Sequence, residues 1–172
     1  MLGIKENEKW RDVIKKISPL PVRDSLYLFS EDAYDSYENQ HYLTDHPIVL
    51  GIAGFLPLTD YIDKNILENT FNAVMDKWDW ESCWGWDFPM AAMCASVLEK
   101  PEKAIDLLLM DNVKNTYLLN GHNYQDSDLE LYLPGNGALL TSVAFMAVNG
   151  GFPKNWKVKY ENFKEIISEY SH

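Results

Sequence analysis

Three segments of this chain are apolar on nearly every side, and each follows a polar loop rich in aromatic residues. The segments span residues 45–57, 89–98 and 137–148. A helix that is apolar all round has to be buried on most sides. They therefore predict three inner helices, with Asp45 and Pro47 at the start of the first and Asp87 and Pro89 at the start of the second.

The remaining periodic segments predict outer helices. Residues 6–17 carry apolar side chains at the i, i+3, i+4, i+7 spacing, residues 63–78 separate an apolar face from a polar one, and a shorter helix is expected from Pro101. The inner helices begin near residues 47, 88 and 136, so the spacings are about 41 and 48 residues, typical of repeated helical hairpins. An α/α toroid and an open helical solenoid of the HEAT type both fit this order.

The loops distinguish the two architectures. All the long loops that are rich in polar and aromatic residues precede inner helices: YENQHYLTDHP, WDWESCWGWDFP and NGHNYQDSDLELYLPGNG. The returns between hairpins are short and plain. These polar, aromatic-rich loops therefore gather at one end of the inner helices, where helix N-termini attract polar ligands. For this reason we favour an all-α fold that is a toroid fragment of about three hairpins.

Composition limits the class of protein. The 172 residues suggest one partial domain over 1–172, and the 47% hydrophobic and 13% aromatic content suffices for a packed core. A formal net charge of -11 argues against nucleic acid and an anionic membrane as partners. Residues 22–44 are expected to form a long acidic loop, and residues 152–172 a tail with a short strand at WKVKYENF.

The cysteines and histidines predict neither a disulfide framework nor a metal site. Cys83 and Cys94 are expected to be free thiols, and the four histidines lack metal-ligand spacing. No cofactor is expected. The N-terminal segment has no apolar signal core, and no apolar run reaches about 18 residues. A cytoplasmic location is expected if Met1 is the natural start, and a periplasmic or secreted one if the chain is part of a longer enzyme.

The stretch WDWESCWGWDF, residues 78–88, holds four of the six tryptophans beside Asp79, Glu81 and Asp87. Indole faces stack on the apolar faces of sugar rings, and carboxylates accept hydrogen bonds from sugar hydroxyls. We therefore interpret Glu81, Trp84, Trp86 and Asp87 as carbohydrate-binding candidates. The plain alternative is a loop that buries its indoles in the core, with Asp87 capping a helix.

Three further groups are candidates for the same pocket. They are Asp45 and His46 at the first inner helix, His122, Asn123, Tyr124 and Gln125 in NGHNYQ, and Asn136 in PGNG. Neutral amides, imidazoles and phenols suit sugar hydroxyls. Each group also has a plain explanation: a capping aspartate with a packed histidine, a turn at Asn120-Gly121, and a tight turn into a helix.

The order of these motifs resembles a known family. Residues 44–63, 78–111, 115–125 and 131–148 together look like the C-terminal half of the catalytic domain of bacterial (α/α)6-barrel glycoside hydrolases. The segments also resemble glycosidase-like proteins of gut Bacteroidetes and, more distantly, glycoside hydrolase families 65 and 95, which include disaccharide phosphorylases and alpha-L-fucosidases. The resemblance runs from about Trp10 to Phe163, and WGWDFPM and GHN…YLPGNG are its most specific parts.

The resemblance implies an inverting, metal-free site in a six-hairpin toroid, of which this chain supplies about half. The general acid of those families lies in the half that is absent here. Where the fucosidase-like members carry aspartate and serine, this chain has Pro134 and Asp87, so no catalytic base is carried over. The resemblance implies pocket membership for the following residues: Asp45, His46, Trp84, Trp86, Asp87, His122, Asn123 and Asn136.

The sequence therefore predicts a carbohydrate-binding fragment of a glycoside-hydrolase-like catalytic domain. Cleavage of a glycosidic bond is expected only if an N-terminal half completes it. Because a partial toroid exposes apolar helix faces, we expect a second copy or that missing half to cover them. Two alternatives stay open: a non-enzymatic helical interaction module, and an intact small glycosidase with Glu81 or Asp87 as its acid.

Overall fold

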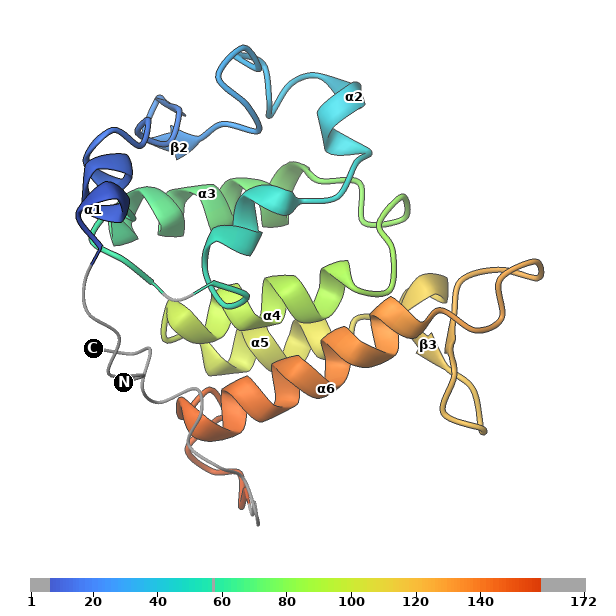
Figure 1. Ribbon diagram of the computed structural model, residues 1–172. Helices are drawn as coiled ribbons and strands as arrows, with labels where there is room; N and C mark the ends of the chain where they lie inside the picture. Colours follow the sequence, from blue (N-terminus) through green and yellow to red (C-terminus); the bar gives the residue numbers. More distant parts are fainter. Residues whose placement is uncertain (1–6, 57, 159–172) are drawn as a thin grey trace.

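The computed structural model describes residues 7–56 and 58–158, and their fold is mostly helical (Figure 1). Six α-helices lie in this part of the chain, which is 46% helix, together with two small two-stranded antiparallel sheets. The predicted helical class is confirmed at this level, but the described residues show no toroid.

The elements follow one another in this order along the chain: α1 Glu8–Lys15, β1 Val22–Arg23, β2 Leu26–Tyr27, α2 Gln40–Leu43, η1 Ile48–Ile52, α3 Lys64–Lys77, α4 Asp87–Val97, α5 Pro101–Leu108, η2 Val113–Asn115, β3 Thr116–Tyr117, β4 Asn123–Tyr124 and α6 Leu133–Val148. The two η elements are 3-10 helices. Strand β1 pairs with β2, and β3 pairs with β4.

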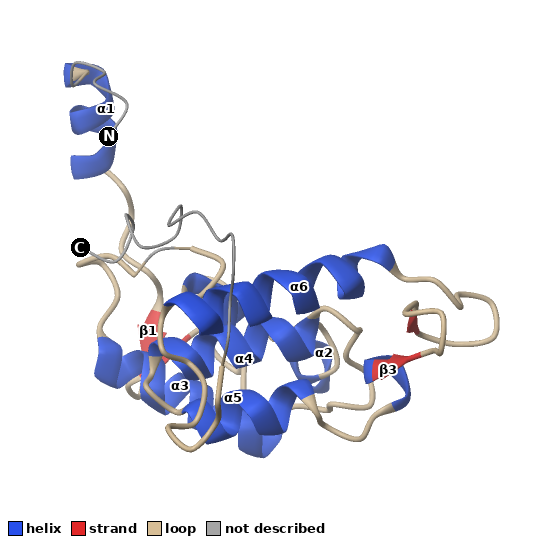
Figure 2. Cartoon of the chain, turned by 90° about the horizontal axis from the view of Figure 1, so that it is seen from below, coloured by secondary structure: helices blue, strands red, loops and turns tan. Residues whose placement is uncertain are grey.

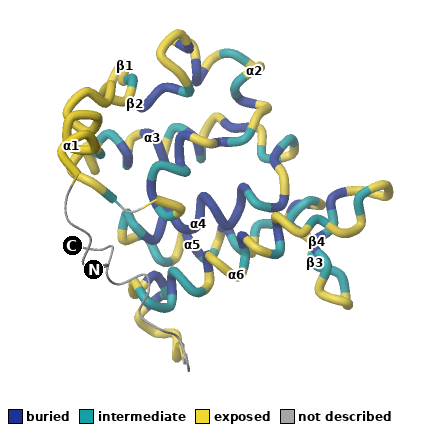
Figure 3. Tube along the Cα trace, in the orientation of Figure 1, coloured by how far each residue is buried: buried dark blue, intermediate teal, exposed yellow. Residues whose placement is uncertain are grey.

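Helix α4 lies at the centre of the core, as its uniformly apolar sequence predicts. Every residue from Asp87 to Ser96 is buried, and α5, α6 and η1 pack against it. Figure 3 shows α4 as a continuous buried segment. Because three of its residues are alanines, Ala91, Ala92 and Ala95, neighbouring elements approach its axis closely.

Helix α3 covers the core from one side and closely matches the prediction for residues 63–78. The Asp63 carboxylate caps it by accepting the backbone N–H groups of Asn65 and Ile66. Leu67, Phe71 and Val74 form its buried face. Full burial of each of these side chains contributes on the order of 2 kcal/mol.

The inner helix predicted for residues 45–57 is wrong, because the described residues of this segment, 45–56, form only the short 3-10 helix η1. Gly54 has a φ of 106°, a left-handed conformation that ends a helix. A Cβ on Gly54 would overlap Met93. The backbone at Gly54 therefore lies directly against α4, and the segment does not continue as an α-helix.

Helix α6 differs from its prediction in two ways. It begins at Leu133, so PGNG lies within its first turns and is not a turn before it; Pro134 is tolerated there because the first helical N–H groups need no partner. The helix is also only partly buried, since the Leu140 side chain is 72% exposed. Its predicted end is confirmed by Gly150, with φ 67°, and by the N–H of Gly151 donating to Met146 O at 2.8 Å.

The N-terminal part lies over α3. The expected loop 22–44 contains the β1–β2 hairpin and α2, so it is less irregular than predicted. Thr70 Oγ1 in α3 accepts the Tyr27 N–H at 2.9 Å and holds the hairpin against the core. Helix α1 buries none of its residues and stands apart in Figure 2, so its apolar stripe lies on the surface.

The predicted strand in the tail is not present in the part that the structure describes. Residues 156–158 are irregular, and the rest of the predicted strand, residues 159–163, lies outside the described residues.

Candidate functional site

The Trp-rich loop connects α3 to α4, and it divides its indoles between the core and the surface. Trp78 is buried and donates its Nε1–H to Asp45 O at 2.8 Å. Trp80 packs on Phe88 with ring centroids 5.7 Å apart. Trp84, in contrast, is 38% exposed. Burial of indoles in the core therefore accounts for Trp78 and Trp80, but it does not account for the exposed part of Trp84.

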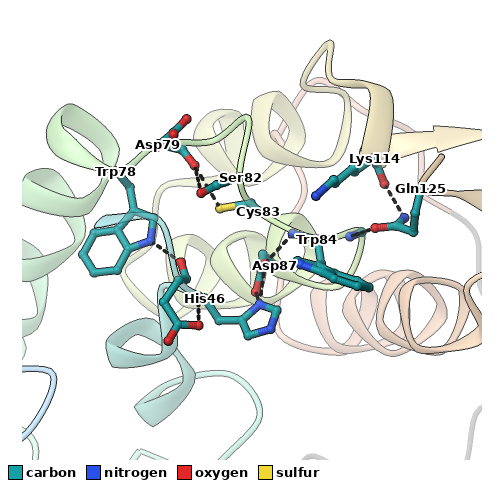
Figure 4. A network of polar contacts seen from close by, with 11 residues as sticks. His46, Trp78, Asp79, Ser82, Cys83, Trp84, Asp87, Lys114 and Gln125 are labelled. Atoms are coloured by element: carbon teal, nitrogen blue, oxygen red, sulfur yellow. Dashed lines mark hydrogen bonds and ion pairs between the residues drawn. The ribbon is translucent and has the colours of Figure 1, made fainter. Parts of the chain in front are cut away.

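Asp87 and His46 form the central polar contact of this region (Figure 4). His46 Nδ1 lies 2.8 Å from Oδ2 and 3.1 Å from Oδ1 of Asp87. Asp87 is fully buried, whereas the His46 side chain is 33% exposed. The contact thus joins a carboxylate inside the core to an imidazole at the surface.

Asp87 does not cap α4, in contrast to the prediction. It is the first helical residue, and Trp86 occupies the N-cap position without a side-chain hydrogen bond. The Asp87 carboxylate accepts the backbone N–H of Trp84 at 2.7 Å instead. Burial raises the pKa of Asp87, while the hydrogen bonds from Trp84 and His46 act in the opposite direction.

The exposed indole of Trp84 is the largest aromatic surface beside this pair. Its ring centroid is 5.3 Å from that of Tyr132 and 6.4 Å from that of His46. Lys114 Nζ lies 5.1 Å from the centre of the indole, a cation–π distance. Trp86 packs edge-on against His46 at 4.8 Å and fixes the other side of the imidazole.

A buried amide, Gln125, connects the Trp-rich loop to the β3–β4 region. Its Oε1 accepts the Gly85 N–H at 3.0 Å, and its Nε2 donates to Asn123 Oδ1 at 2.9 Å. A Cβ on Gly85 would overlap the Asn123 amide. Only glycine therefore lets the loop reach the amides that hold it.

Asn123 and Asn136 are structural in this network. Asn123 is fully buried, and its Nδ2 donates to Lys114 O at 3.1 Å and to Thr116 O at 3.2 Å. Asn136 Oδ1 accepts the Asn123 N–H at 3.0 Å, and its Nδ2 donates to Gly121 O at 2.7 Å. These amides therefore join β4 to the start of α6.

The structure thus brings together only part of the predicted pocket. His46, Trp84, Trp86 and Asp87 contact one another, and Asp45 lies next to His46 but caps no helix, because its Oδ1 accepts the His46 N–H at 2.7 Å. The remaining predicted residues form no side-chain hydrogen bond within residues 7–56 and 58–158: Glu81, His122 and Tyr124.

Sequence reasoning missed two residues at Trp84, namely Lys114 and Tyr132. One signal was available for Lys114, since it is the only lysine or arginine between Lys103 and Lys154. Tyr132 carried no comparable signal, because its position follows from the fold of β4 onto α6.

The two cysteines are buried and form no disulfide. Burial raises the pKa of Cys83, and the negative charges of Asp87 and Asp79 add to the effect. Burial alone raises the pKa of Cys94 to about 12. Because the thiolate is the nucleophilic form, neither side chain suits nucleophilic catalysis.

No metal centre is evident in the described ranges, since no three His, Cys, Asp or Glu side chains gather there. A surface hollow of about 350 Å³ lies between α3 and the start of α5, lined by residues such as Phe71, Met75 and Lys100. Neither His46 nor Asp87 lines this hollow.

Comparison with known proteins adds no assignment. Neither a protein-family model, a curated protein nor a solved structure matches this chain. Within the described residues no helix has the length and apolar character needed to cross a bilayer.

Proposed function

We propose that the chain binds a carbohydrate at the end of the molecule formed by the Trp-rich loop. The observation that carries this proposal is the exposed Trp84 indole, flanked by Tyr132 and Lys114 and close to a hydrogen-bonded His46. An exposed indole gives a sugar ring an apolar platform, and the polar groups beside it contact hydroxyls. Packing against Tyr132 and Lys114 still leaves 38% of Trp84 exposed.

The proposed role includes membership of a glycoside-hydrolase-like catalytic domain. In such a domain, helices α3 to α6 would be consecutive outer and inner elements of an (α/α)6 toroid. This part rests on the sequence resemblance. The burial of α4 and its packing against η1, α5 and α6 are compatible with it.

Bond cleavage by this chain alone is disfavoured by the position of Asp87. A glycosidase generally needs two carboxyl groups at the glycosidic bond. Asp87 is fully buried and already accepts hydrogen bonds from Trp84 and His46, so it does not reach a substrate oxygen. Glu81 and Asp79 are both exposed at the loop, and the Asp79 carboxylate is already engaged by the Glu81 backbone N–H at 3.1 Å. We therefore propose that catalysis requires groups from another half or chain.

A second candidate function is that of a helical interaction module. It is favoured by the exposed apolar residues of α1, such as Trp10 and Val13, and by Leu140 on α6. A second copy or an N-terminal half would cover these faces. The two candidates differ in whether Trp84 contacts a sugar.

Intrinsic fluorescence tests the carbohydrate proposal. The full chain is titrated with D-glucose, D-galactose, D-mannose, L-fucose, maltose and cellobiose. Quenching or a blue shift with at least one sugar, absent in Trp84→Ala, is expected. Leu119→Ala, at an exposed position of the β3–β4 hairpin, is the matched control and should respond like the natural chain. An unchanged spectrum with all six sugars would overturn the proposal.

A further inference from the structure

The two nitrogens of the His46 imidazole have different surroundings. Nδ1 contacts both carboxylate oxygens of Asp87. Nε2 forms no hydrogen bond within the described part of the chain, and the side chain is 33% exposed. In Figure 4 the ring presents one nitrogen to Asp87 and the other away from it.

The hydrogen bonds of Asp87 define the direction of this contact. Asp87 Oδ2 accepts the Trp84 backbone N–H at 2.7 Å, and a backbone N–H acts only as a donor. When Asp87 is ionised its carboxylate only accepts, and in that state His46 donates from Nδ1. A neutral imidazole that donates from one nitrogen is an acceptor at the other, which leaves the acceptor lone pair on Nε2.

We propose that His46 is the proton acceptor of this site and that Asp87 is its positioning residue. In this arrangement Nε2 accepts a hydrogen bond from a hydroxyl group of a ligand or from a water beside Trp84. When the hydroxyl proton moves to Nε2, it leaves an alkoxide or hydroxide and an imidazolium, whose charge is balanced by the Asp87 carboxylate. The ligand class is a hydroxyl compound; its assignment as a carbohydrate rests on the proposed function above.

The neighbours of His46 hold its ring in this orientation. Trp86 packs edge-on against the imidazole at 4.8 Å, and the Asp45 carboxylate accepts its backbone N–H at 2.7 Å. The Trp84 indole lies 6.4 Å from the ring. In the proposed arrangement a ligand on that indole lies beside the imidazole, and Trp86 packs against the same ring.

The tautomer of His46 tests the inference without a ligand. Long-range proton–nitrogen correlation spectra of the full ¹⁵N-labelled chain at neutral pH report which ring nitrogen carries the proton. His46→Gln assigns the signal. We expect Nδ1–H with a free Nε2 for His46. A neutral Nε2–H tautomer would overturn the inference.

Reaction with diethyl pyrocarbonate tests the availability of Nε2. We expect His46 to be modified at Nε2, and Asp87→Asn to slow this reaction several-fold, since an amide can donate to Nδ1 as well as accept from it. The exposed His41, which has no contact with Asp87, is the internal control and should react equally in both proteins. An unreactive His46, or an unchanged rate in a folded Asp87→Asn chain, would contradict the proposal; if that variant does not fold, the tautomer of the natural chain decides.

The outcomes separate this inference from the carbohydrate proposal. Protection of His46 from the reagent by a sugar of the panel would support both. A correct tautomer without protection or quenching would retain the acceptor and overturn the carbohydrate assignment. A neutral Nε2–H tautomer together with clear quenching would overturn the acceptor role of His46 and retain the carbohydrate assignment.

Discussion

A side chain on Gly135 would overlap Oδ1 of Asn123, because the first turn of α6 lies directly against this buried amide. Gly137, two residues along the same helix, has open space around it. The two glycines therefore serve different purposes, although they stand in one short motif, and alanine substitution distinguishes them.

Gly135→Ala is expected to destabilise the chain by about 1–3 kcal/mol, since an overpacked contact forces neighbouring groups to shift. Gly137→Ala is expected to stabilise it by about 0.5–1 kcal/mol, because alanine favours a helix over glycine. Urea unfolding measures both changes. Equal effects of the two substitutions would contradict the close packing of α6 on Asn123.

Removal of the buried carboxylate is expected to cost about 2 kcal/mol of unfolding free energy. Asp87→Ala leaves the N–H of Trp84 and the Nδ1–H of His46 without their acceptor, and buried unpaired groups carry penalties of this size. Glu81→Ala, at an exposed carboxylate of the same loop, should lie within about 0.5 kcal/mol of the natural chain. Comparable urea midpoints for the two variants would argue against a structural role for Asp87.

The raised pKa of Asp87 predicts how stability depends on pH. A carboxyl whose folded pKa exceeds its unfolded value binds protons more tightly in the folded state, so stability falls as pH rises from about 4 to the folded pKa. The unfolding free energy of the natural chain should therefore fall relative to that of Asp87→Asn across this window. Paired urea titrations at several acidic pH values measure the difference. If the unfolding free energy of the natural chain instead rose with pH relative to that of Asp87→Asn, the raised pKa of Asp87 would be contradicted.

The central helices and the Trp-rich loop were predictable for simple physical reasons. Residues 89–98 contain no polar face, so α4 is buried, and the cap at Asp63 precedes an amphipathic stretch that forms α3. The segment 45–57 has the same apolar character, but Gly54 and its contact with Met93 prevent an α-helix there. Hydrophobicity predicted burial only in part there, since Val49, Leu50 and Ala53 are buried while Ile48, Phe55 and Leu56 are exposed. It predicted the backbone incorrectly.

The site was predictable in its residue types but not in their pairing. His46 and Asp87 were both candidates, yet 41 residues separate them, and no local pattern indicates a contact over that distance. Asn123 and Asn136 were chosen for their hydrogen-bonding capacity, which the structure uses internally between β4 and α6. Polar groups suited to a ligand are equally suited to the protein's own backbone.

The exposed face of α6 predicts self-association of the chain. Leu140 is 72% exposed on helix α6, whose buried residues lie on one face, and Leu133 and Val143 are exposed as well. Covering such an exposed face removes apolar surface from water. Sedimentation equilibrium at micromolar concentrations should show association of the natural chain and its loss in Leu140→Glu. Leu119→Glu, at a fully exposed hairpin position, should associate normally. A natural chain that stays monomeric would contradict this expectation.

The indole N–H resonance of Trp84 gives the most direct test of carbohydrate binding. A proton–nitrogen correlation spectrum of the labelled chain is recorded during titration with the six sugars, and Trp84→Phe and Trp78→Phe assign the signals. Binding at the proposed site shifts the Trp84 resonance in a saturable way, while that of the buried Trp78, which donates to Asp45 O, moves much less. If no sugar shifts the Trp84 resonance, or if all indole signals drift together without saturation, the proposed carbohydrate site is wrong.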